Sequence, residues 1–256
     1  MNSETEIKTT EPVVKTEIKT EVKIDTKIEL KPQNLDIKIE ELYTLGGHYG
    51  YKRARRHPSC LPYLHSARNG SDIINLDKTR DQIIKAFIAL STAKAAGKKV
   101  LFVGTKPEAR ESVKQIASSL DMSFVDRRFV GGTITNFSEI GKRINAMNDL
   151  NKKQAEDTLV FKTKKEKLMI EREIIKLNET FGGLKDFTNL PGLVVIVDPK
   201  KESIAVTEAI RKRIPIIALS NSDCNIANID FPIIVNEASK KSVELVLMLL
   251  KEALTS

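Results

Sequence analysis

Cysteine is scarce in this sequence, which contains only Cys60 and Cys224, far apart along the chain. Two thiols make no disulfide framework, and the absence of any CxxC pair argues against the common zinc and redox motifs. A reducing compartment is therefore the simpler expectation for the folded chain.

Long apolar segments are also missing. The N-terminus, MNSETEIKTTEPVV, contains no apolar stretch of the kind that a secretory signal requires. The longest strongly apolar runs, such as Leu193–Val197, are far too short to span a bilayer. We therefore expect a soluble intracellular protein with no membrane partner.

Motifs that carry enzyme chemistry are absent as well. The turn GTKPEA at residues 104–109 begins like a phosphate loop but departs from G-x-x-x-x-G-K-[ST]. Neither G-x-G-x-x-G nor the G-x-S-x-G nucleophile elbow occurs. Lys106 could contact a phosphate there, while Asp198, at a strand end, is better explained as a cap for the next helix. These absences predict a protein that is not an enzyme and holds no cofactor.

The chain has three histidines, His48, His57 and His65, spaced by nine and eight residues. This spacing matches neither H-E-x-x-H nor another common metal motif, although Cys60 lies among them. We therefore predict no metal site, and expect these rings to hydrogen-bond to the backbone or to phosphate.

Positive charge is unevenly distributed along the chain. The formal net charge is +8 and the isoelectric point is near 9.3, which suits a polyanionic partner. Residues 1–40 hold seven lysines and nine acidic residues, so they carry −2 and residues 41–256 carry +10. Because residues 1–40 repeat a Thr/Glu/Ile/Lys unit without aromatic residues, we expect a disordered extension. The alternative is a segment that becomes ordered on a partner.

Apolar patterns over residues 41–256 alternate between helices and short buried strands. Strands are predicted at 100–104, 192–198 and 214–220, with helices between and after them, and a short first helix at 39–46. The alternation predicts an α/β fold: a Rossmann-like αβα domain with a mostly parallel sheet.

The pattern changes between about residues 136 and 182, where two amphipathic helices are predicted. Narrow apolar stripes and wide polar faces favour a protruding antiparallel helical hairpin, a coiled coil. The alternative is two ordinary helices packed on the sheet. Asn136, followed by Glu139, resembles a capping box at the start of the first helix.

Residues 46–69, GGHYGYKRARRHPSCLPYLHSARN, concentrate basic side chains. No acidic residue occurs between Glu41 and Asp72, so these cations lack a nearby counterion in the sequence. Guanidinium groups bind phosphate as a fork, and the interspersed tyrosines offer stacking faces. We expect Pro58 and Pro62 to keep the segment extended. A charge run is more often a solvated face, but this density favours a nucleic-acid partner.

Several stretches together resemble the bacterial-type small-subunit ribosomal protein two family, over nearly all of residues 41–256. That family's opening Gly-x-His-Phe-Gly is matched by GGHYG, and its ILFVGTK by VLFVGTK. Its RWLGGxLTN is matched by RFVGGTITN at 128–136, and its GGIKD…LP by GGLKD…LP at 182–191. Its VIDPxKExIAVxEA is similar to VIVDPKKESIAVTEA at 195–209.

The resemblance implies a structural constituent of the small ribosomal subunit, cytoplasmic or organellar, that binds small-subunit rRNA and supports translation. It also implies neighbouring ribosomal proteins as partners, including the large mRNA-binding one, and no homo-oligomer. The residues that we expect to bind RNA are Lys52, Arg53, Arg55, Arg56, His57, Arg68, Lys106, Arg127, Arg128 and Asn136.

The sequence departs from the family pattern at three places near these residues. Tyr51 stands where the family has a histidine, and Arg56–His57 replaces Trp-Asn. The loop NSDCNI at 221–226 lacks the aspartate and proline of the family's DTNCDP. Two other functions stay open at this point: an enzyme that acts on a phosphorylated small molecule, and a helical-hairpin adaptor that binds only proteins.

Overall fold

The computed structural model describes residues 37–156 and 163–255. The disorder predicted for residues 1–40 falls largely outside the described residues. Ile37 is buried, and helix α1 (Ile39–Thr44) begins where the predicted first helix does. The link between the two helices of the predicted hairpin, residues 157–162, also lies outside them.

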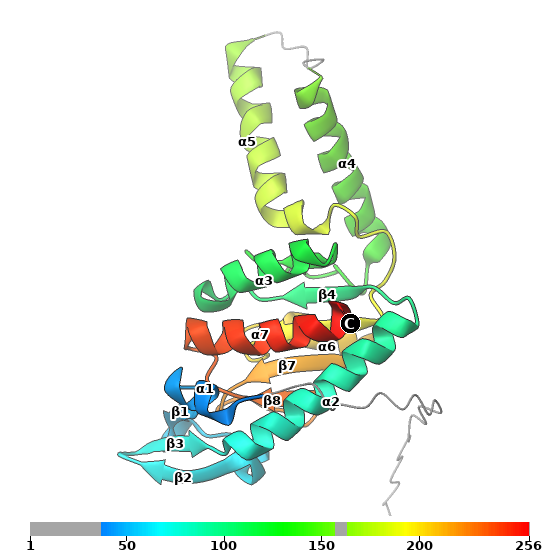
Figure 1. The fold of residues 1–256 in the computed structure, drawn as a ribbon. Coiled ribbons are helices and arrows are strands. Elements are labelled where there is room, and N and C mark those ends of the chain that lie inside the picture. Colours follow the sequence, from blue (N-terminus) through cyan, green and yellow to red (C-terminus); the bar gives the residue numbers. More distant parts are fainter. Residues whose placement is uncertain (1–36, 157–162, 256) are drawn as a thin grey trace, which may run out of the picture. The chain divides into compact units, whose positions relative to one another are not determined.

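Five parallel strands form the central sheet in the order β5-β4-β6-β7-β8 (Figure 1). They are β4 (Val100–Val103), β5 (Ser123–Val125), β6 (Leu193–Val197), β7 (Ile216–Ser220) and β8 (Phe231–Ile234). The chain runs outward from β4 to β5 and then returns to build the sheet on the other side of β4. This order makes a doubly wound sheet and confirms the predicted Rossmann-like α/β fold.

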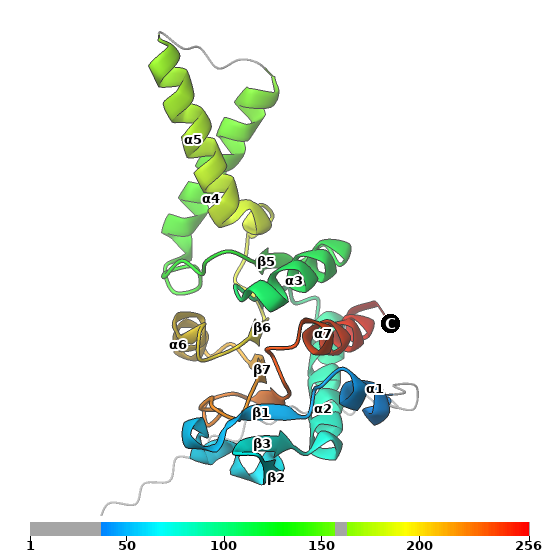
Figure 2. The same ribbon diagram turned by 90° about the vertical axis from the view of Figure 1, so that its left-hand side faces the viewer.

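Helices cover both faces of this sheet, as Figure 2 shows. The first face packs against α1, α2 (Leu76–Ala95), α3 (Pro107–Ser119) and α7 (Lys240–Thr255), and the second against α6 (Ser203–Arg211).

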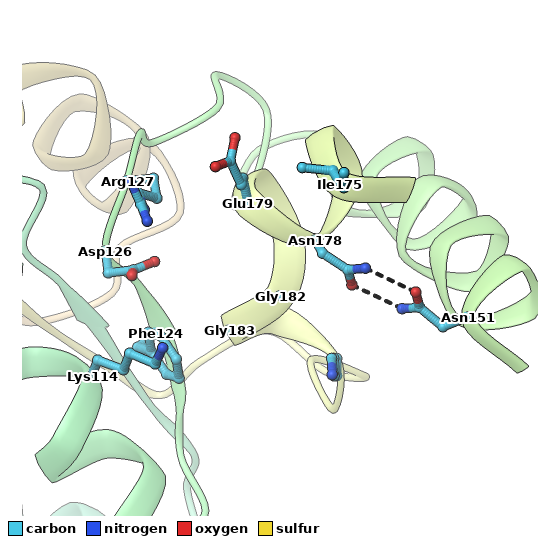
Figure 3. A pocket seen from close by; sticks show the side chains of 11 residues that line it. Lys114, Phe124, Asp126, Arg127, Asn151, Ile175, Asn178, Glu179, Gly182 and Gly183 are labelled. Atoms are coloured by element: carbon cyan, nitrogen blue, oxygen red, sulfur yellow. Dashed lines mark hydrogen bonds between the residues drawn. The ribbon is translucent and has the colours of Figure 1, made fainter. Parts of the chain in front are cut away.

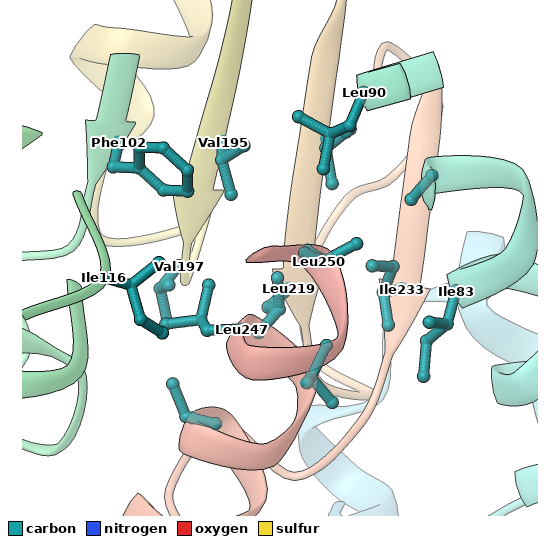
Figure 4. Packing of buried hydrophobic residues seen from close by; sticks show 14 of the residues in the cluster. Ile83, Leu90, Phe102, Ile116, Val195, Val197, Leu219, Ile233, Leu247 and Leu250 are labelled. Carbon is teal, nitrogen blue, oxygen red and sulfur yellow. The ribbon is translucent and has the colours of Figure 1, made fainter. Parts of the chain in front are cut away.

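Successive strand residues point to opposite faces, so each strand contributes to two cores. In β6, Leu193, Val195 and Val197 enter the first core, whereas Val194 and Ile196 enter the second. Figure 4 shows the first core, where Phe102 and Leu219 of the sheet meet apolar side chains of the covering helices. Burial on both faces explains why the strands read as continuous apolar runs.

A second sheet, which the sequence did not predict, precedes α2. It is antiparallel, with the order β1-β3-β2. Its strands are β1 (Tyr49–Lys52), β2 (Leu64–Arg68) and β3 (Ser71–Ile74). The connection from β1 to β2 contains two short 3-10 helices, η1 (Arg53–Arg55) and η2 (Pro58–Tyr63). The prediction that the prolines keep this segment extended is therefore wrong: Pro58 opens a helical turn and Pro62 lies within it.

Two further helices, α4 (Phe137–Ala155) and α5 (Lys164–Phe181), occupy the region of the predicted hairpin. Ile140, Ile144 and Met147 of α4 and Phe181 of α5 join the second core. The short helix η3 (Gly182–Leu184) follows α5 and lies against β5. The predicted capping box is wrong, because the Asn136 side chain makes no capping hydrogen bond to α4.

Across residues 37–156 and 163–255, no helix combines the length and the apolar character that crossing a bilayer would require.

Candidate nucleic-acid interface

A cluster of exposed cations lies at one end of the small antiparallel sheet. Lys52 ends β1 and Arg68 ends β2, and the register places both opposite Ser71 of β3. The backbone N–H of Arg53 donates to the carbonyl of Gly70, at 2.8 Å, which fixes the start of η1 beside the β2–β3 turn. The sheet therefore brings together three basic residues that lie up to sixteen positions apart in the sequence.

These three side chains are exposed, and among the described residues no carboxylate lies within ion-pair distance of them. The same holds for Arg127 and Arg128, which follow β5. We call Lys52, Arg53, Arg68, Arg127 and Arg128 the free cations.

The antiparallel sheet is attached to the end of the parallel strand β7. The N–H of Tyr51 donates to Ser222 Oγ at 3.0 Å, and the N–H of His57 donates to the Ser222 carbonyl at 2.8 Å. Since Ser222 follows β7 and Arg127 follows β5, both groups of free cations belong to one edge of the parallel sheet. This edge, where all five parallel strands end, is the carboxyl edge.

The other two cations of the basic segment have carboxylate partners within the chain, although Arg55 shares its partner, Asp223, with Lys200. Arg56 forms a two-pronged ion pair with Asp72, whose side chain is fully buried. The hydrogen bonds that Arg56 donates to Asp72 raise the pKa of Arg56. Arg55 lies 3.5 Å from Asp223 and 4.7 Å from the centre of the Tyr51 ring. The expectation that these cations lack counterions is thus wrong for Arg55 and Arg56.

Lys106 is similarly engaged. Its Nζ lies 3.2 Å from Glu237 Oε1 and 3.5 Å from Asp198 Oδ2, and the Tyr51 hydroxyl donates to the same Glu237 oxygen at 3.2 Å. Burial acts to lower the pKa of Lys106, but Glu237 and Asp198 outweigh it, so the pKa is raised. Burial raises the pKa of the Glu237 carboxyl, and Lys106 opposes that rise. Lys106 therefore serves as the internal counterion of two carboxylates.

This network fills the place where a doubly wound fold usually binds its ligand. The strand order reverses between β4 and β6, and ligands of such folds bind outside the carboxyl ends at that reversal. Here Lys106 and Thr105 follow β4, while Asp198 and Glu202 follow β6. Lys106 pairs with Asp198, and Thr105 donates a short hydrogen bond to Glu202. Charged and polar side chains of the protein itself therefore occupy the position at which a doubly wound fold usually binds its ligand.

Arg127 and Arg128 lead into a loop that is held by a buried carboxylate. Glu208 of α6 accepts hydrogen bonds from three backbone N–H groups, those of Gly132, Ile134 and Thr135, at 2.5, 2.9 and 3.1 Å. Successive backbone N–H groups in such a loop form an anion-binding concavity. The Glu208 carboxylate occupies this concavity from inside the fold. The loop therefore positions α4, and its concavity does not bind phosphate.

Replacing Glu208 by glutamine should loosen this loop without unfolding the sheet. Glutamine keeps one acceptor oxygen but removes the charge, so charge-assisted bonds become weaker neutral ones. We expect amide hydrogen exchange of Gly132, Ile134 and Thr135 to accelerate at least about tenfold, the factor that 1.4 kcal/mol of lost protection gives. The amides of β6 should be unchanged. Equal exchange of the loop in both proteins would contradict the role given to Glu208.

His48, His57 and both cysteines make contacts within the fold. His48 is buried with its ring 4.2 Å from that of Tyr43, and burial lowers its pKa. His57 Nδ1 accepts from the N–H of Ser59 at 3.2 Å and thereby caps η2. Burial raises the pKa of Cys60, and that of Cys224 to about 12, so both are weak nucleophiles. No group of three His, Cys, Asp or Glu among the described residues could hold a metal.

The predicted residues thus fall into two sets. The free cations and the exposed Asn136 present unpaired polar groups to solvent. Arg55, Arg56, His57 and Lys106 instead take part in contacts within the fold. Sequence reasoning did not identify four carboxylates of the site, those of Asp72, Asp223, Glu208 and Glu237. Only Glu208 and Glu237 stand in a recognisable pattern, because each interrupts or follows a strongly apolar segment of the sequence.

Comparison with known proteins gives a consistent result. The family model described as Ribosomal protein S2 matches residues 42–256. A protein of Roseiflexus sp. (strain RS-1) called small ribosomal subunit protein uS2 is 39% identical over 210 residues, covering 82% of this chain and 80% of that protein. Proteins of the same description from Chloroflexus aurantiacus and Chloroflexus aggregans are 38% and 37% identical over 209 residues, covering 82% of this chain and 88% of each relative.

Proposed function

Because the chain belongs to the ribosomal protein S2 family, we propose that it is a structural constituent of the small ribosomal subunit that binds rRNA along its carboxyl edge. Members of this family are structural proteins and not enzymes. The location that follows is the small subunit, which is cytoplasmic in bacteria, and the activity that follows is support of translation.

The observation that carries the proposal is the set of free cations at the carboxyl edge. Five basic side chains that no carboxylate of the described residues neutralises would repel one another unless an anion lies between or beside them. An RNA backbone supplies such anions at a regular spacing. Phosphate contacts position a protein on RNA, and the shape of the folded RNA supplies the specificity.

The ion pairs within the basic segment support this assignment by fixing where the free cations lie. Arg56–Asp72 holds the turn after β1, and Tyr51–Glu237–Lys106 holds β1 against the parallel sheet. A rigid scaffold lowers the entropy lost when RNA binds. Arg55, His57 and Asn136 are proposed to contact RNA as well, with Arg56 and Lys106 acting through the shape of the site.

We further propose that α4 and α5 form an antiparallel hairpin that reaches a separate site on the particle. Asn151 and Asn178 exchange two hydrogen bonds of 2.8 Å across the helices, which supports their pairing. Leu168, Met169 and Ile175 remain exposed on α5, as expected for a surface that meets another ribosomal component.

Neighbouring small-subunit proteins, including the large mRNA-binding one, are the proposed protein partners, and the chain is proposed to act without forming a homo-oligomer. The enzyme alternative is not supported by the comparisons, whose matches are ribosomal proteins. An adaptor that binds only proteins would leave the free cations without a role.

Salt dependence tests the RNA-binding proposal. Each phosphate contact contributes about −0.7 to −0.9 to the log–log slope of affinity against salt, so five contacts predict about −3.5 to −4.5. The measurement is filter binding of the purified protein to small-subunit rRNA over a range of potassium chloride concentrations. A slope near zero would overturn the proposal.

A further inference from the structure

Gly182, the residue directly after α5, leaves open space at the base of that helix. It ends α5 with φ −57° and ψ −32°, a right-handed conformation that any residue adopts. A Cβ built there would meet no atom within 4 Å. Its neighbour Gly183 differs, because a Cβ there would collide with the carbonyl oxygen and ring of Phe124.

Gly182 lines a cavity of about 580 Å³ between the edge strand β5 and the base of α5 (Figure 3). The volume falls within the range of small-molecule sites. Its walls carry three cations from three elements: Lys114 of α3, Arg127 after β5, and Lys185 after η3. No carboxylate of the described residues lies within ion-pair distance of any of them.

The remaining walls bear groups of a different chemistry. Asp126 and Glu179 present carboxylates, and Phe124 contributes an aromatic side chain. Asn151 and Asn178 satisfy each other and so form a closed part of the wall, as the dashed lines in Figure 3 show. Cations, acceptors for hydroxyl or amino groups, and an aromatic side chain together correspond to the phosphate, the sugar and base edges, and the base face of a nucleotide.

We propose that this cavity receives one unstacked nucleotide of the small-subunit rRNA, with its backbone close to Gly182. The inference rests on the proposed function and adds a second contact to it. Lys114, Arg127 and Lys185 neutralise the adjacent phosphates, and the absent side chain at Gly182 lets the RNA backbone approach.

Continuity with the carboxyl edge favours RNA over a free phosphorylated metabolite. Arg127 is shared between the cavity and the free cations, so one strand can pass from the cavity to the edge. The carboxylates of Asp126 and Glu179 also repel a free phosphate. In a nucleotide, the sugar and the base separate the phosphate charge from these carboxylates, whereas a free phosphate has no such spacer.

The test is Gly182→Leu, a substitution that the right-handed backbone allows and that places a bulky side chain beside the cavity. We expect its affinity for small-subunit rRNA, measured by filter binding at 0.15 M salt, to fall about tenfold, equivalent to losing one to two phosphate contacts. Its melting temperature should not fall below that of the wild type, because the backbone of Gly182 is compatible with any side chain. Gly141→Leu is the matched control, because Gly141 lies in α4 with open space around it but does not line the cavity. Its affinity should stay that of the wild type.

A second measurement is ultraviolet crosslinking of the rRNA complex, followed by mass spectrometry of peptides. We expect a nucleotide on the peptide that contains Phe124, and its loss in Gly182→Leu. Wild-type affinity of Gly182→Leu, or the same crosslink in both proteins, would overturn the inference. Saturable thermal stabilisation by adenosine or uridine monophosphate would also overturn it, by assigning the cavity to a free nucleotide.

The proposed function fails separately from this inference. If the wild-type protein binds rRNA with a slope near zero, RNA binding itself is wrong. If that slope is steep and Gly182→Leu binds normally, only the cavity assignment is wrong.

Discussion

Replacing Lys52, Arg53, Arg127 and Arg128 together by alanine lowers the affinity for small-subunit rRNA about two-hundredfold at 0.15 M salt. Each lost phosphate contact removes the release of about 0.7 counterion, which at this salt concentration is a factor of about four in the binding constant. The log–log slope should become shallower by about 3. Filter binding at several salt concentrations measures both quantities.

The variant should fold normally, because these four side chains are exposed and have no ion-pair partner among the described residues. A matched control replaces Lys94, Lys99, Arg211 and Lys212, which precede β4 and β7 at the opposite edge of the sheet and are also exposed. The control changes net charge by the same amount. If both variants lose the same affinity, binding follows total charge and the carboxyl edge has no special part in it.

Replacing Asp72 by alanine destabilises the protein by about 3 kcal/mol, because it leaves the half-buried Arg56 guanidinium without its partner. Arg56 keeps some exposure and can turn toward water, which places the cost at the lower end of the range for buried pairs. For a domain of this size the melting temperature should fall by about 6 to 12 °C, as differential scanning calorimetry would measure.

The exposed pair Lys142–Glu139 on α4 provides the comparison. Glu139→Ala should cost less than about 1 kcal/mol, since exposed pairs contribute little. A small effect of Asp72→Ala would mean that Arg56 is as free as Arg53, and the basic segment would then have four unpaired cations instead of three. Rescue of stability by the double variant Asp72→Ala with Arg56→Leu would support a buried pair that a well-packed apolar side chain can replace.

Local patterns predicted the parallel sheet because its three inner strands, β4, β6 and β7, are buried on both faces, whereas the partly exposed edge strand β5 was not predicted. Residues 100–103, 193–197 and 216–220 are continuous apolar runs, and each lies next to a helix with a clear stripe. The first helix of this domain is followed by Gly46, which has a left-handed backbone conformation with φ 75°. In the sequence, the glycine itself is the feature that indicates the end of this helix.

The antiparallel sheet was not predicted from the sequence because its residues are mostly exposed. Strand β2 has no buried residue, so it shows no apolar alternation, and the register is fixed by pairing with β3 instead of by a core. The prolines favoured an extended segment locally, but Pro58 begins a 3-10 turn whose N-cap is His57. A proline in the first turn of a helix loses no hydrogen bond, which explains the outcome.

Charge pairing was the least predictable part of the site. Asp72 is 16 residues from Arg56, and Asp223 is 168 residues from Arg55, so no sequence window contains both partners of the second pair. Counting charges along residues 46–69 identified the basic segment correctly but could not separate Arg53, which is free, from Arg56, which is paired. That separation decides which arginine to mutate in a binding experiment.

The central claim is that the free cations are tolerated because rRNA neutralises them in the assembled particle. Its most direct test is sedimentation of the purified protein with small ribosomal subunits that lack their own copy, before and after ribonuclease treatment. The account predicts that the wild type sediments with intact particles, that the four-alanine variant does not, and that digestion of the RNA releases the wild type. Retention of the protein on ribonuclease-treated particles would contradict the account.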